Sequence, residues 1–261
     1  MALSLKVEHV YPATGGSALW RGTSLCDASE FELYLRGPVR KRVEDTAEEE
    51  RLKTDLKALE FTGMNPAFVE KLLSASPPPI DWEIGEALAE CLLEDEFAVA
   101  WPWNENRDRK TPKASLPGAD IVGFADDGDG AVFLFGEVKT SSDKGAPPGV
   151  MSGRSGLAHQ IDDLATSIQI HLALIKWLGA RCRDTEFQGR FESALARYVK
   201  SEGKDFQLVG VLLRDTPPHA DDLRTRGVAL AKKAPLPKTR LDAWYAPRSI
   251  SDWVTLTMAS T

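Results

Sequence analysis

The stretch that decides the fold runs from Pro117 to Thr140 and reads PGADIVGFADDGDGAVFLFGEVKT. Two runs rich in β-branched and aromatic residues, Ala119 to Phe124 and Ala131 to Lys139, flank the segment Asp126-Asp127-Gly128-Asp129-Gly130. Asp and Gly are favoured in tight turns, so the pattern predicts a β-hairpin. Val132-Phe133-Leu134-Phe135 is apolar on both faces, which is typical of a central strand.

The register of this hairpin predicts a cluster of charged side chains. With the turn centred near Gly128, Asp120 lies opposite Gly136 or Glu137. Glu137 and Lys139 are two residues apart, so their side chains point to the same face of the strand. We therefore expect Asp120, Glu137 and Lys139 to converge near the end of this strand.

The three charged residues suit a metal-assisted hydrolysis. Two facing carboxylates repel each other unless they share a cation, and hard oxygen ligands select Mg²⁺ or Mn²⁺ over zinc. Lys139 is placed to orient or deprotonate an attacking water, or to neutralise the charge that develops on a phosphorane. This is the chemistry of phosphodiester hydrolysis with one or two metal ions.

Asp120 and the run Glu137-Val138-Lys139, at hairpin spacing, resemble the signature of the PD-(D/E)XK nuclease superfamily. The resemblance implies an α/β fold, with a mixed central sheet flanked by helices in a restriction-endonuclease-like core. It also implies that Asp120, Glu137 and the main-chain carbonyl of Val138 hold the metal, and that Lys139 serves the water.

The resemblance extends to two further positions. Members of the superfamily often carry another glutamate on the helix before the hairpin. Glu86 is the first choice for it, with Glu90 and Glu83 as alternatives on the same acidic stripe. A glutamine on the helix after the lysine corresponds to Gln160. The alternative for each is a plain, solvated position on a helix surface.

A narrower resemblance covers the chain after Pro79. The run from Trp82 through Asp120 to Ser141 is similar to the nuclease subunit family of Hachiman antiphage defence, HamA. This likeness implies a DNA substrate, a helicase partner of the HamB type, and nuclease activity that is restrained until invasion is sensed.

The amino-acid composition bears on two questions: how the chain could contact DNA, and in which cellular compartment it is expected. Lys and Arg number 32 and Asp and Glu number 39, giving a formal charge of −7, so DNA contact requires local basic patches or a partner. No apolar run approaches the roughly 20 residues that a membrane span needs. Three widely spaced cysteines and no signal-peptide pattern indicate a reduced, cytoplasmic setting.

One boundary is expected near Ser74-Ala75-Ser76-Pro77-Pro78-Pro79, where three prolines favour an extended connector. It divides the chain into residues 1–76, an N-terminal α/β cap or interaction region, and residues 77–261, the nuclease domain. A helix is predicted from Asp81, acting as its N-cap, to about Glu96.

Further elements follow the hairpin. Apolar residues at intervals of three and four predict one long helix from Leu157 to near Gly179, and a second helix around Phe191 to Tyr198. Phe206 to Leu213 reads as a buried strand. Leu241 to Tyr245 and Trp253 to Met258 are expected to add edge strands.

Competing interpretations accompany these predictions. His159 and His171 lack a neighbouring nucleophile and are read as core or surface residues. The Asp126 to Gly130 segment lacks the closing glutamate of a calcium loop and is read as a turn. Trp101 and Trp103, near a basic stretch with Arg107, Arg109, Lys110 and Lys113, suit base stacking or plain burial.

The predicted function is therefore a metal-dependent deoxyribonuclease. One alternative is a catalytically silent nuclease-fold module that binds DNA or docks on a partner protein. Another is a phosphohydrolase that acts on small molecules.

Overall fold

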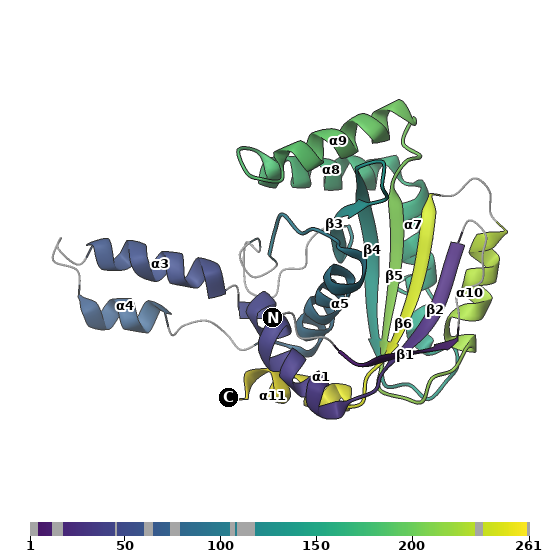
Figure 1. The fold of residues 1–261 in the computed structure, drawn as a ribbon, viewed down its shortest axis with the longest axis horizontal. Coiled ribbons are helices and arrows are strands. Elements are labelled where there is room, and N and C mark those ends of the chain that lie inside the picture. Colours follow the sequence, from purple (N-terminus) through teal and green to yellow (C-terminus); the bar gives the residue numbers. More distant parts are fainter. Residues whose placement is uncertain are drawn as a thin grey trace.

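A six-stranded mixed β-sheet forms the centre of the molecule (Figure 1). The computed structural model describes residues 5–11, 18–44, 46–59, 65–73, 79–104, 108, 118–232 and 237–259. The strand order is β1-β2-β6-β5-β4-β3. The strands are β1 (Val7–Tyr11), β2 (Ala18–Leu25), β3 (Ile121–Asp126), β4 (Ala131–Ser141), β5 (Gln207–Arg214) and β6 (Lys238–Tyr245).

The four inner strands, β2, β6, β5 and β4, run parallel, and the two edge strands β1 and β3 pair antiparallel with their neighbours. The carboxyl ends of the inner strands therefore lie along one edge of the sheet, where α/β proteins commonly place their sites. The predicted α/β class with a mixed central sheet is confirmed.

Helices cover both faces of this sheet (Figure 1). The helical segments are α1 (Ala28–Tyr34), the π-helical η1 (Leu35–Val39), α2 (Arg40–Glu44), α3 (Thr46–Leu59), α4 (Pro66–Leu73), α5 (Asp81–Phe97), η3 (Gly149–Met151), α7 (Leu157–Thr166), α8 (Ile168–Cys182), α9 (Gln188–Lys200), α10 (Asp221–Ala231), η4 (Ile250–Asp252) and α11 (Trp253–Met258).

Alternation along the strands creates two separate cores. Phe133 and Phe135 of β4 join a core with α7, α8, α9 and α10, whereas Val132, Leu134 and Val138 of the same strand join a core with α1, α5 and α11. A strand that is apolar on both faces is what a central position requires. The face that carries odd-numbered residues of β4 is therefore the α7 face, and the opposite one is the α5 face.

The predicted long helix is wrong in one respect, because the chain forms two helices there. Ser167 leaves the helical conformation, with φ −86° and ψ 98°, and its side chain accepts a hydrogen bond from the N–H of Ile170 at 3.4 Å. Ser167 thus ends α7 and acts as the N-cap of α8.

Three smaller expectations also differ from the structure. Asp81 is the first residue of α5 rather than its cap, and the Glu83 carboxylate accepts from the Ile80 N–H at 2.8 Å. β6 is an interior strand between β2 and β5 rather than an edge. Trp253–Met258 is the helix α11, because its buried residues, Trp253 and Thr257, are spaced by one helical turn.

The N-terminal region contributes directly to the sheet. β1 and β2 lie within the first 25 residues. β1 pairs with β2 and β2 pairs with β6, so this part of the expected cap belongs to the same sheet as the hairpin. α3 and α4 project away from the body (Figure 1). The expected boundary falls mainly on residues 74–78, outside the described residues. In the described part of the chain, no helix has the length and apolar character needed to span a bilayer.

Candidate active site

The β3–β4 hairpin brings the predicted residues to one place. Ile121 pairs with Gly136 and Asp126 with Ala131, which confirms the predicted hairpin and sets Asp120 at the level of Glu137. Gly128 adopts a positive φ of 91° in the turn, a conformation that glycine adopts without strain.

Hydrogen bonds join the three charged side chains. Asp120 Oδ2 accepts from the Val138 N–H at 2.9 Å, and Lys139 Nζ donates to Glu137 Oε1 at 2.6 Å. The carboxyl groups of Asp120 and Glu137 are also in hydrogen-bond contact. The structure therefore places Asp120, Glu137 and Lys139 in one cluster, which we call the DEK cluster.

Glu137 is the most deeply buried member of the DEK cluster. Its residue is only 3% exposed. Burial first, and then the negative charge of Asp120 and the hydrogen bond with it, raise the pKa of Glu137 to about 8, although Lys139 acts in the opposite direction. Near neutral pH Glu137 therefore holds its proton most of the time when no cation is bound.

The donor atoms of the DEK cluster fit a hard divalent cation. A strand residue directs its N–H and C=O toward the same neighbour. The Val138 carbonyl therefore faces the edge on which Asp120 lies. Two carboxylates and one carbonyl are ligands that Mg²⁺ and Mn²⁺ accept. Burial and then the negative charge of Asp120 raise the pKa of Glu137, and a cation would offset both by favouring the ionised carboxylate.

The described residues do not assemble a larger acidic ligand set. No group of three His, Cys, Asp or Glu side chains that could hold a metal ion occurs among them. The DEK cluster thus offers two acidic ligands, and a further acidic ligand would have to come from another position or be replaced by water.

The three candidate glutamates on α5 lie in different surroundings. Glu83 binds the Ile80 N–H, as described above, and Glu90 is buried in an ion pair with Arg42 of α2. Glu86 is half-buried. A Cβ on its neighbour Gly85 would lie 2.5 Å from Thr140 Oγ1, so this turn of α5 lies beside the end of β4. α5 packs on the face of the sheet opposite to Glu137, and Glu86 forms no group of three acidic side chains with Asp120 and Glu137 among the described residues. The structure therefore does not bring Glu86 to the DEK cluster.

Gln160 lies on the α7 face, the face that carries Glu137. Gly210 of β5 pairs with Glu137 in the ladder, and a Cβ on Gly210 would lie 3.4 Å from Leu157 and 3.5 Å from Ile161 of α7. Gln160 is adjacent to these two residues on the helix. Its Oε1 is buried and has no hydrogen-bond partner among the described residues.

The alternative sites have structural explanations. The turn interpretation of the Asp-rich segment is confirmed, because Asp126 pairs with Ala131 across the β3–β4 hairpin. Asp127 in this turn forms a bidentate ion pair with Arg197 at 2.8 and 3.0 Å. His171 is buried and contacts Tyr198 Oη at 2.7 Å. Trp101 and Trp103 are buried. The basic residues Arg107, Arg109, Lys110 and Lys113 lie outside the described residues.

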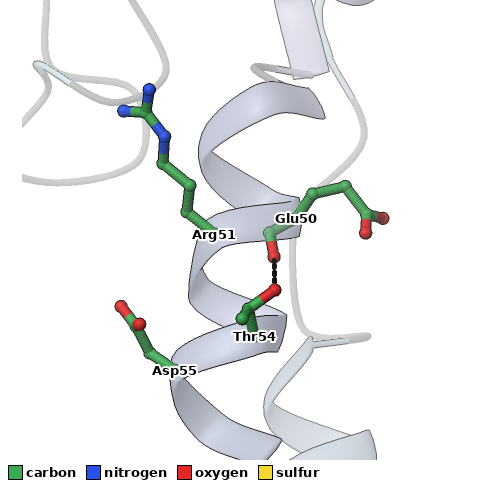
Figure 2. A pocket seen from close by; sticks show the side chains of 4 residues that line it. All are labelled: Glu50, Arg51, Thr54 and Asp55. Atoms are coloured by element: carbon green, nitrogen blue, oxygen red, sulfur yellow. Dashed lines mark hydrogen bonds between the residues drawn. The ribbon is translucent and has the colours of Figure 1, made fainter.

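A recess of about 380 Å³ lies on α3, remote from the DEK cluster in the fold (Figures 1 and 2). Four α3 residues line it, and the Thr54 hydroxyl donates to the Glu50 carbonyl at 2.9 Å. The remaining lining residues are Arg51 and Asp55. These side chains offer mixed charge on an open helix surface and no pair of facing carboxylates.

Sequence reasoning missed two residues at the end of β5 that hold the chain beyond β4. Arg214 ends the apolar strand β5 and Asp215 follows it, and both contact the chain that leaves β4. The signal in the sequence is a charged pair that ends an apolar run before Thr216-Pro217-Pro218. Their contacts depend on the β4–β5 pairing, which local patterns do not reveal.

The candidate active site thus consists of the DEK cluster, with the Val138 carbonyl beside Asp120 and Gln160 on the helix that covers the same face. The catalytic roles of these residues stay predictions. Comparisons with protein-family models, with curated proteins and with solved structures find no match for this chain.

Proposed function

We propose that this chain is a Mg²⁺- or Mn²⁺-dependent nuclease that hydrolyses phosphodiester bonds in DNA. The observation that carries the proposal is the contact between two carboxyl groups, one of them buried with a raised pKa, beside a lysine ammonium 2.6 Å away. Perturbed carboxylates of this kind occur preferentially at functional sites.

Each residue of the site has a role in this proposal. A bound divalent cation would polarise the phosphate and activate a water. Asp120, Glu137 and the Val138 carbonyl hold that cation. Lys139 orients the attacking water and stabilises negative charge on the phosphate in the transition state. Gln160 supplies an amide from the adjacent helix to the water or the substrate.

DNA as substrate, a HamB-like helicase partner and a role in antiphage defence are parts of the proposal that rest on the sequence resemblance. The charge of −7 supports a partner, because the chain as a whole repels a polyanion. A helicase that holds the DNA would supply the attraction that this chain lacks.

The experiment incubates plasmid and linear DNA with the full chain and Mg²⁺, Mn²⁺ or EDTA, with and without a helicase partner. We expect metal-dependent cutting that falls at least about a hundredfold in a Glu137→Ala, Lys139→Ala double variant. Glu192→Ala, on the exposed side of α9, is the control and is expected to cut normally. Equal cutting by the double variant would contradict the proposal.

A silent nuclease-fold module is the second candidate. One observation favours it: the described residues bring together two acidic side chains rather than three, and Lys139 is already paired with Glu137. DNA binding without cutting under every metal and partner condition would support this candidate. Turnover of free nucleotides with no cutting of polymers would indicate a small-molecule phosphohydrolase.

A further inference from the structure

The chain that leaves β4 is tied to the chain that leaves β5. The β4–β5 ladder ends where Ser141 pairs with Arg214. Beyond the ladder, the Ser142 hydroxyl donates to Asp215 Oδ2 at 2.9 Å, and Arg214 Nη2 donates to the Gly145 carbonyl at 3.2 Å. We call Arg214 and Asp215 the exit clamp, because they hold the first residues after β4.

Arg214 is an unusually buried anchor for this purpose. Its residue is 1% exposed. Its Nε donates to Thr216 Oγ1 at 3.0 Å and lies 3.7 Å from Asp222 Oδ2, which in turn accepts from Tyr245 at 2.8 Å. The guanidinium is planar and is held on several sides, so its position is fixed. Because Arg214 Nη2 donates to the Gly145 carbonyl, the fixed guanidinium also holds this carbonyl in place.

Asp215 connects the same region to the exit of β6. Its Oδ2 also accepts from the Ile250 N–H at 2.9 Å and the Ser249 hydroxyl at 3.3 Å. The loop after β4 is itself closed by Asp143, whose carboxylate accepts from the N–H groups of Gly145 and Gly149 at 2.9 and 2.8 Å. The exit clamp therefore holds a loop that is already folded on itself.

We propose that Arg214 and Asp215 are positioning residues for Lys139. Lysine is a point charge on a flexible stem, so its ammonium is located only as well as the backbone beneath it. Lys139 lies two residues before the end of β4, and its Nζ contacts Glu137 at 2.6 Å. The exit clamp stops this strand end from fraying, and so keeps Lys139 at the site. This inference rests on the proposed function.

Two variants and one control test the exit clamp in the full chain. Asp215→Ala removes the carboxylate, and Ser142→Ala removes only its bond to the β4 exit. Ser249→Ala is the matched control, because it removes a bond from the same carboxylate to the β6 exit. We expect faster backbone hydrogen exchange at residues 139–145 in the first two variants and unchanged exchange there in the control.

The same variants are measured in DNA cleavage. Misplacing a catalytic group slightly lowers turnover more than binding, so we expect kcat to fall about tenfold in Asp215→Ala, with KM for DNA unchanged. In a Lys139→Gln background Asp215→Ala is expected to cause no additional loss. A full additional loss in that background would overturn the positioning role.

Hydrogen exchange and DNA cleavage together distinguish an error in the exit-clamp proposal from an error in the nuclease proposal. Unchanged exchange at residues 139–145, or the same acceleration in Ser249→Ala, would overturn the clamp whatever the activity. Faster exchange with normal kcat would overturn its effect on Lys139. If the unmodified chain cuts no DNA, the proposed function fails and the positioning role fails with it. Faster exchange would then support only the structural clamp.

Discussion

At the scale of single residues, the burial of Glu137 lowers the stability of the fold when this carboxyl group is ionised. Its carboxyl group is buried against Asp120, and the raised pKa records the free energy needed to ionise it there. Active-site groups are often held in such unfavourable surroundings, because the same field favours a bound cation.

The pH dependence of stability follows from this shift. The pKa of Glu137 rises from 4.5 to about 8 on folding, so between these values the folded state binds more protons than the unfolded state. The contribution of Glu137 to the free energy of unfolding therefore falls as pH rises from 4.5 to 8. Glu137→Gln removes this dependence and is expected to raise the unfolding free energy at pH 8 by about 3 kcal/mol.

Urea unfolding of the metal-free chain at the two ends of this pH range measures the effect. Glu192→Gln, at an exposed position, is the control and is expected to leave the pH dependence unchanged. If Glu137→Gln is less stable than the unmodified chain at pH 8, the buried carboxyl contact described here is wrong.

At the scale of secondary-structure elements, two contacts hold the hairpin in place. Asp127 in the turn binds Arg197 of α9 and Lys238 at the start of β6, which lowers the pKa of Asp127 well below its usual range. On the α5 face, Gly85 allows α5 to approach the end of β4 closely. The turn is thus fixed at one end of the strand and α5 at the other.

The Asp127 contact makes the first prediction about elements. Asp127→Asn is expected to lower the unfolding free energy by about 2 kcal/mol, because it weakens a bidentate ion pair. Asp129→Asn changes an exposed carboxylate of the same turn and is expected to have little effect. Because the pKa of Asp127 is lowered, its contribution is lost as pH falls below about 4. Equal stability of the two variants in urea would contradict this role.

The close approach of α5 to β4 at Gly85 gives the second prediction about elements. Alanine normally stabilises a helix by up to about 1 kcal/mol relative to glycine. At position 85 the new Cβ would lie 2.5 Å from Thr140 Oγ1, so we expect Gly85→Ala to destabilise the fold by about 1–2 kcal/mol. Adding Thr140→Ala is expected to restore the melting temperature. A more stable single variant would show that α5 and β4 are farther apart.

The hairpin and α5 were predictable because their signals are local. Asp and Gly residues define the turn, and alternation then fixes the faces of Glu137 and Lys139. The break at Ser167 was not predictable, since the apolar spacing continues across it. The alternation in Trp253–Met258 suggests a strand, but its two buried residues are spaced by one helical turn.

At the scale of the whole molecule, sheet order and long-range contacts lie beyond a single sequence. No local sequence pattern indicates that β2 pairs with β6, or that Glu90 forms an ion pair with Arg42. The carboxyl edge of the parallel strands gathers the end of β4, the exit clamp and the DEK cluster at one side of the sheet. The proposed nuclease function requires these residues to lie close together at this edge of the sheet.

Calorimetric titration of the metal-free chain with Mn²⁺ near neutral pH, in two buffers of different ionisation enthalpy, tests the central claim most directly. We predict binding that releases about one proton, because a cation replaces the proton that the raised pKa of Glu137 retains. Binding should be lost in Asp120→Asn and Glu137→Gln and retained in Lys139→Met. Absence of binding, or equal binding by all of these variants, would contradict the account.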